Sequence, residues 1–166
     1  PPRTYGLLTP GEEVKGVEFE AWYQANRQLS FTLLYAGFNG RITGAPPGRN
    51  ALIGYELPRA PEQSANLMVN YKLEGDGPLG GTRWTFGANY KNDVWLDTGL
   101  NLNTLERRSD AGTVLFAVIA KDFRLPRNRV LGERLNIGNL LDRNYISEGF
   151  TFGEKRTYRL ATELRF

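Results

Sequence analysis

The sequence contains no cysteine and no histidine. Disulfides, thiolate nucleophiles and imidazole bases are therefore excluded, together with the ordinary zinc and copper ligand sets. Most enzyme mechanisms need at least one of these groups. We accordingly expect a protein that is not an enzyme, with no catalytic residues, no bound metal and no cofactor.

Long hydrophobic runs are also missing. The longest apolar stretch, Val114 to Ala120, covers only seven residues, whereas a membrane-spanning helix needs roughly 18 or more. A helical membrane protein is therefore excluded. The 166 residues are enough for one domain. They begin Pro-Pro-Arg with neither an initiator methionine nor an apolar secretory stretch, so we interpret the chain as a processed or excised piece.

Charge of one sign is not concentrated anywhere along the chain. The 21 basic and 18 acidic residues are scattered and leave a formal charge of +3. A nucleic-acid-binding protein gathers its basic residues into a stripe, so we expect no nucleic acid among the partners. Glycine is abundant at 19 residues, and many short segments end in Gly, Pro, Asn and Asp clusters, which favours an all-β chain.

Apolar and polar residues alternate with a period of two, which predicts strands with one apolar and one polar face. The clearest case has Ala65, Leu67, Val69 and Tyr71 on one face. Seven long strands follow, at residues 17–24, 29 to about 42, 64–72, 83–91, 113–121, 130–137 and about 155–166. Short connections (25–28, 74–81, 124–128) alternate with mostly longer ones, among them 43–63 and 92–110. This alternation predicts an antiparallel transmembrane β-barrel segment, a meander with short periplasmic turns and longer extracellular loops.

Aromatic residues collect near the ends of the apolar faces. Trp and Tyr prefer membrane interfaces because part of each side chain is apolar and part can hydrogen-bond to water or headgroups. Beside the short periplasmic turns we expect a belt formed by Tyr23, Phe31, Tyr71, Trp84 and Phe166. Tyr90 and Tyr158 are expected nearer the outer interface.

A soluble β-sandwich or lipocalin-like barrel is the alternative fold, since it also alternates apolar and polar positions. Such a protein would spread its aromatic residues through a core instead of collecting them near strand ends. The run Val114 to Ala120 fits the sandwich better, because it is apolar on both faces. In a membrane barrel, this run has to contact lipid on one side and another protein element on the other.

The segment Leu135 to Tyr145, LNIGNLLDRNY, resembles the signature L-N-V-x-N-L-F-D-K-x-Y that lies near the end of TonB-dependent receptors. Three further pieces occur in the order found in that family, at residues 14–20, 57–64 and 153–166. The chain departs from the family pattern at Leu141, where Phe is more usual, and at Glu154, where Pro is common.

This resemblance implies a 22-stranded barrel in the bacterial cell outer membrane, filled by an N-terminal plug. Residues 1–166 are then the C-terminal portion of that barrel, with the plug, the earlier strands and the TonB box absent. The implied function is import of a scarce ligand, most simply a ferric siderophore, driven by the TonB complex acting through the missing N-terminal region. Cobalamin, haem or a glycan is the alternative cargo.

The remaining implied partners are outer-membrane lipid and the barrel-insertion machinery. A terminal aromatic residue after alternating apolar residues is similar to the signal that directs barrels to insertion, which Tyr158, Leu164 and Phe166 would carry. A different possibility is a small standalone structural or adhesin barrel. That protein would need an eighth strand, for which residues 4–8 are the candidate.

Ligand contacts are expected in the extracellular connections. One carries Trp95, Arg107 and Arg108, and Arg and Trp suit an anionic, aromatic chelate such as a catecholate or hydroxamate. The other carries Arg49 and Tyr55. The open alternative is that such residues pack their own loops or contact lipopolysaccharide phosphates. Two structural interpretations complete the prediction: Glu18 and Glu20 are solvated lumen charges, and the residues around Asp142 form a strand end and turn.

Overall fold

The computed structural model describes residues 11–45, 48, 50–58, 60–95, 108–148 and 151–166. Seven strands form one antiparallel sheet in chain order: β1 (Glu12–Gln24), β2 (Leu29–Ile42), β3 (Gln63–Lys72), β4 (Arg83–Lys91), β7 (Gly112–Leu125), β8 (Arg129–Gly138) and β11 (Thr157–Arg165). The predicted all-β meander of seven strands is confirmed. In the part of the chain that is described, no helix has the length and hydropathy needed to cross a membrane.

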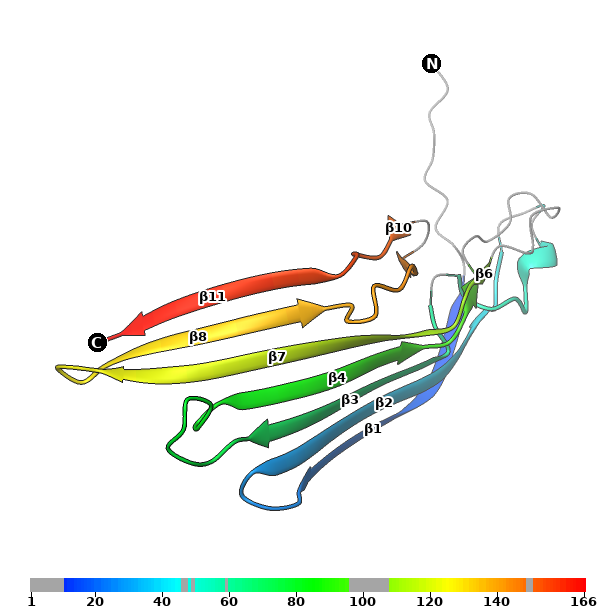
Figure 1. Cartoon of the computed structure of the whole chain (residues 1–166). Coiled ribbons are helices and arrows are strands. Elements are labelled where there is room, and N and C mark those ends of the chain that lie inside the picture. Colours follow the sequence, from blue (N-terminus) through cyan, green and yellow to red (C-terminus); the bar gives the residue numbers. More distant parts are fainter. Residues whose placement is uncertain (1–10, 46–47, 49, 59, 96–107, 149–150) are drawn as a thin grey trace.

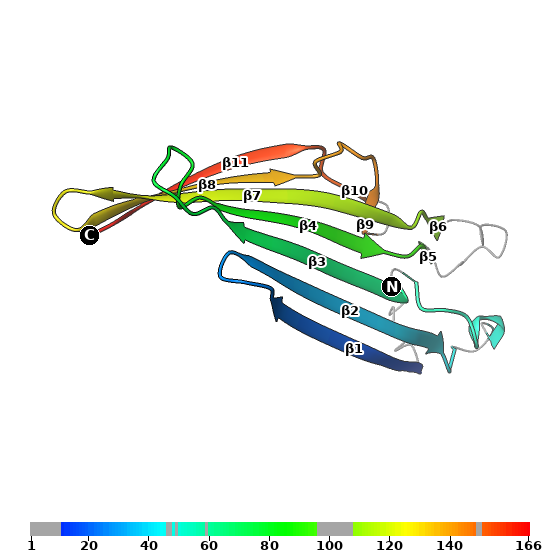
Figure 2. The ribbon, with the colours of Figure 1, turned by 60° about the horizontal axis from the view of Figure 1, so that its bottom comes forward.

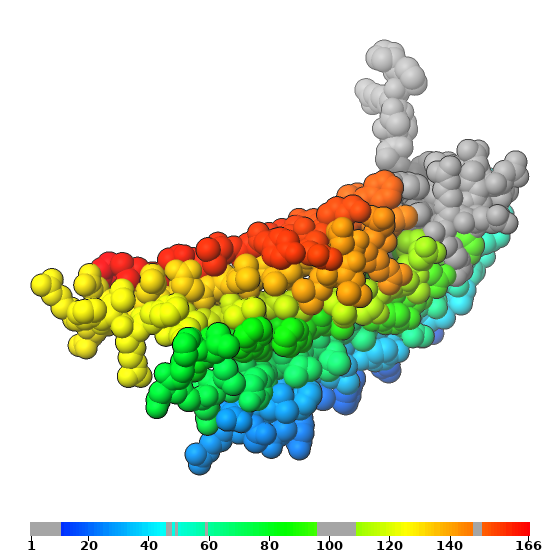
Figure 3. All heavy atoms as spheres, viewed as in Figure 1, coloured from blue at the N-terminus to red at the C-terminus, as the bar shows by residue number. Residues whose placement is uncertain are grey.

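The sheet is one curved layer, with the strands side by side in sequence order (Figures 1 and 3). Short turns at residues 25–28, 73–82 and 126–128 lie at one end of it, which we call the turn end, and the C-terminus lies there too (Figures 1 and 2). Among the described strands, β1 pairs only with β2 and β11 only with β8, so the sheet has two open edges and does not close into a barrel.

Smaller elements gather at the opposite end, the loop end (Figures 1 and 2). Two ribbons and a 3-10 turn lie there: β5 (Val94–Trp95) paired with β6 (Arg108–Ser109), β9 (Ile146–Glu148) paired with β10 (Thr151–Phe152), and η1 (Asn50–Leu52). The sequence did not predict these elements, because strands of two or three residues are too short to show a period of two.

Strand ends differ from the sequence prediction by two or more residues at three places. β1 begins at Glu12 instead of residue 17, because residues 12–16 pair with residues 38–42 of β2 although their own alternation is weak. β7 continues to Leu125, which reduces the predicted turn to residues 126–128, with Arg127 and Asn128 at positive φ. β11 begins at Thr157 instead of residue 155.

The register places apolar residues on one face of all seven strands, because directly paired residues of an antiparallel sheet point to the same side. One row of paired residues crosses the whole sheet: Tyr23, Phe31, Val69, Phe86, Ala117, Ile137 and Tyr158. The neighbouring row on the other face is Gln24, Ser30, Asn70, Thr85, Val118, Asn136 and Arg159. We call these the apolar face and the polar face.

The strands are also staggered. The apolar row starts at Tyr23, one residue from the turn end of β1, and finishes at Tyr158, one residue from the loop end of β11. A row perpendicular to the strands therefore crosses the sheet from one end to the other. Such a stagger is the shear that strands must have when they tilt around a barrel axis.

Candidate functional site

Three of the five residues predicted from the sequence to contact ligand lie at the loop end. Tyr55, Trp95 and Arg108 all lie in or beside its small elements. Arg49 and Arg107 lie outside the described residues, as does the candidate eighth strand at residues 4–8. The ligand contacts proposed for these side chains stay predictions.

The connection after β2 folds back along the end of that strand. The backbone N–H of Ile42 donates to the Tyr55 carbonyl at 3.0 Å, and the N–H of Leu57 donates to the Gly40 carbonyl at 3.0 Å. Arg41 Nη1 donates to the Gly54 carbonyl at 3.1 Å. These bonds hold the loop against β2 and leave the side chain of Tyr55 exposed.

The ribbon β5–β6 places Trp95 directly opposite Arg108 in register. It is anchored by Ser109, which is almost fully buried and whose Oγ accepts a hydrogen bond from the N–H of Val94 at 3.3 Å. Trp95 itself is half-buried. Two of the three residues proposed from this connection, Trp95 and Arg108, are thus neighbours through backbone pairing.

A hollow of about 260 Å³ lies at the loop end, where residues 143–147 fold over the ends of β4 and β7. Lys91 Nζ donates to the carbonyls of Ile146 and Ser147, both at 2.7 Å. Arg143 Nη2 donates to the Ala111 carbonyl at 3.0 Å. The lining includes cationic, aromatic and acidic residues: Lys91, Arg143, Tyr90, Tyr145 and Asp110, beside Asn89, Gly112, Val114 and Ser147.

The segment with the receptor-like signature positions Arg143 at this hollow. Asn139 Nδ2 donates to the carbonyls of Arg143 and Glu154 at 2.8 and 3.0 Å, and Asn139 Oδ1 accepts the N–H of Arg143 at 2.9 Å. Asp142 Oδ1 accepts the N–H of Arg156 at 2.8 Å. Asn139 and Asp142 both have positive φ, which these residue types tolerate in turns. The interpretation of this segment as a structural turn is confirmed.

Sequence reasoning did not find the hollow. Its cationic residues bind carbonyls that are 55, 56 and 32 residues away along the chain, so no local pattern marks them. In the sequence, Arg143 lies in the segment predicted to be a turn and Lys91 is the last residue of a predicted strand. Among the described residues, no group of three or more Asp and Glu side chains is placed to hold a metal ion.

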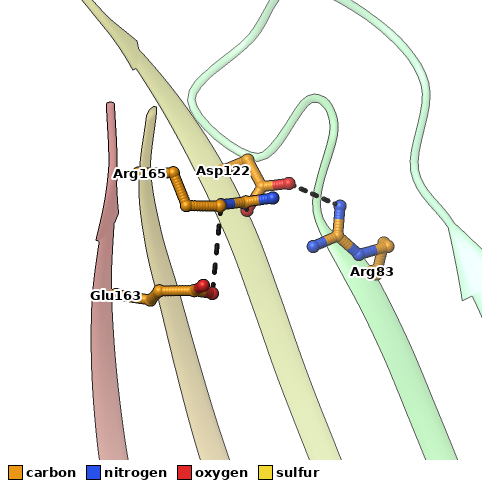
Figure 4. A network of polar contacts seen from close by, with 4 residues as sticks. All are labelled: Arg83, Asp122, Glu163 and Arg165. Atoms are coloured by element: carbon orange, nitrogen blue, oxygen red, sulfur yellow. Dashed lines mark hydrogen bonds and ion pairs between the residues drawn. The ribbon is translucent and has the colours of Figure 1, made fainter. Parts of the chain in front are cut away.

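A second polar cluster lies on the polar face near the turn end (Figure 4). Asp122 on β7 bridges two arginines: its Oδ2 is 3.2 Å from Arg83 Nη1 on β4, and its Oδ1 is 2.9 Å from Arg165 Nη2 on β11. Arg165 Nε is 3.9 Å from Glu163 Oε2. The cluster links three strands, of which β7 and β11 are not adjacent.

Gly132 makes the bridge over β8 possible. It pairs with Asp122 on one side and with Glu163 on the other, so it lies beneath the ion pair. A Cβ atom at this position would be 3.2 Å from Asp122 Oδ1 and 3.5 Å from Arg165 Nη2. The absence of a side chain lets the two ions meet above the backbone of the strand between them.

Aromatic residues lie at both ends of the apolar face. Tyr23 pairs with Phe31 in register, and their rings stack with centroids 6.3 Å apart. Tyr71 pairs with Trp84. These pairs and Phe166 lie at the turn end, whereas Tyr90 and Tyr158 lie at the loop ends of β4 and β11. Contact of these side chains with lipid stays a prediction.

A staggered antiparallel sheet with one mostly apolar face, one polar face, short turns and long loops is the wall of a transmembrane β-barrel. Residues 2–140 match the family described as TonB dependent receptor-like, beta-barrel. The chain belongs to this family. No curated protein sequence matches the chain closely enough to count as a relative.

Solved structures with the same fold include several siderophore receptors. The chain is similar to BauA, the ferric preacinetobactin receptor from Acinetobacter baumannii, with a TM-score of 0.76 and 17% identity over 92% of this chain and 22% of that one. For PiuA, a siderophore receptor from the same organism, the TM-score is 0.68 and the identity 21%, over 91% and 21% of the two chains. For the ferric citrate transporter FecA, the values are 0.73 and 20%, over 91% and 24%.

The chain therefore spans only about a fifth to a quarter of the length of these proteins. The family is one of transporters and receptors and not of enzymes. Its barrels are outer-membrane proteins of Gram-negative bacteria, which places this chain in the outer membrane, with the turn end at the periplasmic side.

Proposed function

We propose that this chain is the C-terminal part of the barrel of a receptor that binds a ferric siderophore outside the cell and imports it with energy from the TonB complex. Membership of the TonB-dependent receptor family is the observation that carries this proposal. The similarity in fold to siderophore receptors supports the choice of cargo.

The proposed receptor is larger than the 166 residues. The open edges of β1 and β11 then pair with strands from the rest of the receptor, which also supplies the plug and the N-terminal region that TonB contacts. The insertion signal is proposed at Tyr158, Leu164 and Phe166, which share the apolar face of β11 and its extension and are all exposed. The described strands of this piece enclose no lumen, so the piece alone should not transport a ligand.

The loop end offers the chemistry that an anionic ferric chelate needs. Lys91 and Arg143 line the hollow there together with Tyr145. Cations in a hollow raise the local concentration of an anionic ligand, and aromatic faces pack against catecholate rings. In this proposal the ligand first contacts the loops that carry Arg49, Tyr55, Trp95, Arg107 and Arg108 and then reaches the hollow.

The test is ligand binding to the full-length receptor in which Trp95, Arg107 and Arg108 are all changed to Ala. Affinity for the cognate ferric siderophore should fall at least about tenfold, as expected when one charged contact worth about 1.4 kcal/mol is lost. Arg124→Ala is the matched control, since Arg124 lies near the turn end and should leave affinity unchanged. Unchanged affinity in the triple variant rejects these residues as ligand contacts.

The cargo is tested separately, by growth of cells that depend on this receptor. Growth limited by iron should be restored by one ferric siderophore. If cobalamin, haem or a glycan is taken up through the receptor and no siderophore is, then the assignment of cargo is wrong while the receptor class stands.

A further inference from the structure

A row of polar residues crosses the apolar face near the turn end of the last three strands. Lys121 on β7 pairs with Glu133 on β8, and Glu133 pairs with Thr162 on β11. The row lies between apolar residues on both sides, with Ile119, Leu135 and Leu160 towards the middle of the sheet. Towards the turn end, the next residues on the same face are Phe123, Leu131 and Leu164.

The register shows at which depth this row lies. The first two hairpins each have an aromatic pair at the turn end. Tyr23 and Phe31 lie in the apolar row itself, whereas Tyr71 and Trp84 lie two residues from that row towards the turn end, so the position of the pair shifts by two residues from one hairpin to the next. If the shift grows by another two residues in the third hairpin, the corresponding position lies four residues from the apolar row towards the turn end. On β7 and β8, four residues from Ala117 and Ile137, that position is occupied by Lys121 and Glu133. The third hairpin therefore has a Lys–Glu pair at the level where the first two have aromatic pairs.

The three side chains are held on the surface. Thr162 Oγ1 donates to the Glu133 carboxylate, 3.0 and 2.9 Å from its two oxygens. Lys121 Nζ donates to the Pro78 carbonyl of the β3–β4 turn and lies 5.2 Å from the centre of the Phe123 ring. An ammonium has three donors and a carboxylate about four acceptor positions, so both groups retain capacity for a ligand.

The depth of this row in the membrane limits which molecules can bind to it. A charged residue on the lipid face costs about 2–4 kcal/mol at the bilayer midplane but about 0–1 kcal/mol near the interface, so the row is tolerated at headgroup depth. Phospholipid headgroups surround the barrel there. A cation and an anion side by side are complementary to a headgroup that itself carries a phosphate and an ammonium.

We propose that Lys121, Glu133 and Thr162 bind a phosphoethanolamine headgroup in the periplasmic leaflet of the outer membrane. Lys121 binds the phosphate, Glu133 accepts hydrogen bonds from the primary ammonium, and Thr162 orients the Glu133 carboxylate. The site depends on the orientation of the barrel in the outer membrane and not on the cargo of the receptor, so it stands or falls separately from siderophore import.

Native mass spectrometry of the delipidated full-length receptor tests this site. Dioleoyl-phosphatidylethanolamine should bind several-fold more tightly than dioleoyl-phosphatidylcholine, whose methylated ammonium cannot donate hydrogen bonds, and than dioleoyl-phosphatidylglycerol, which has no ammonium. Glu133→Gln should abolish the preference for dioleoyl-phosphatidylethanolamine, and Lys121→Gln should weaken the binding of all three lipids. Arg134→Gln is the control, because Arg134 follows Glu133 in sequence but lies on the polar face.

Equal binding of the three lipids by the unmodified receptor overturns the proposal, and this measurement needs no variant to fold. Retention of the preference in Glu133→Gln overturns it as well. Loss of the preference in Arg134→Gln to the same extent also overturns it, since the effect would then be a general consequence of altered charge.

Discussion

At the scale of single residues, two glycines let side chains cross over a strand. A Cβ atom at Gly87 would be only 2.0 Å from Phe116 Cζ, so the ring of Phe116 on β7 lies directly over the backbone of β4. At Gly132 the ion pair between Asp122 and Arg165 crosses β8 in the same way. In both cases a large or long side chain covers the backbone of a residue that has no side chain of its own.

Gly87→Ala should destabilise the receptor by about 1–3 kcal/mol, because the new methyl group and the ring of Phe116 cannot occupy the same space. Urea unfolding of the full-length protein in detergent micelles, followed by tryptophan fluorescence, measures this loss. In a Phe116→Ala background the same substitution should cost almost nothing, because the obstacle is gone. An equal loss in both backgrounds would show that the ring is not the reason for the glycine.

Gly132→Leu should separate Asp122 from Arg165 by placing a side chain between them. The expected loss is about 1 kcal/mol or less, since the ions are partly exposed to water. A double-mutant cycle with Asp122→Asn checks the cause. The two substitutions together should cost less than the sum of their separate effects, and strict additivity would assign the role of Gly132 to something other than the ion pair.

At the scale of strands, the packing of β7 explains an apolar run that would otherwise favour a soluble sandwich. The run Val114 to Ala120 is apolar on both faces, and a barrel strand of this kind needs a protein contact on its polar side. The structure provides part of that contact within the sheet, where Phe116 covers Gly87 of the neighbouring strand. An apolar residue on the polar face is thus explained by local packing.

Strand β3 offers the clearest test of which face meets lipid. Spin labels placed singly at Leu67 and Val69 of the full-length receptor in bilayers should collide with lipid-soluble oxygen. Labels at Asn66 and Asn70, on the other face, should collide with a water-soluble reagent instead. The opposite pattern, or no lipid exposure at any of the four positions, would contradict the membrane orientation and the lipid site with it.

At the scale of the whole molecule, the described strands form one curved sheet that does not close into a barrel. The hydrogen-bonding groups along the outer edges of β1 and β11 have no strand beside them among the described residues. Unpaired strand edges pair readily with other chains. In hydrocarbon such edges are more costly than in water, since each unsatisfied backbone group costs several kcal/mol.

The isolated 166-residue chain should therefore self-associate through these edges when refolded in detergent, whereas the full-length receptor should be monomeric. Light scattering coupled to size-exclusion chromatography distinguishes the two. A monodisperse, monomeric fragment with native-like resistance to urea would show that the piece closes on itself and would support a small standalone barrel over part of a receptor.

The sequence by itself determined the strands, their facing and the alternation of short and long connections. These features are local: a strand with lipid on one side and water on the other has an apolar residue at every second position, as residues 64–72 do. The signature at Leu135 to Tyr145 likewise indicated the family, since it is contiguous in the chain. The five proposed loop contacts rest on residue type and position alone.

Only the tertiary structure decided how the strands combine. The register set the stagger of two residues per hairpin, and the stagger brought Lys121, Glu133 and Thr162 to one level. It also placed Gly132 beneath the pair formed by Asp122 and Arg165 and brought Lys91 to the carbonyls of Ile146 and Ser147. Alternation specifies which face a residue occupies, but not which residue of another strand lies beside it, because that depends on how the whole sheet shears.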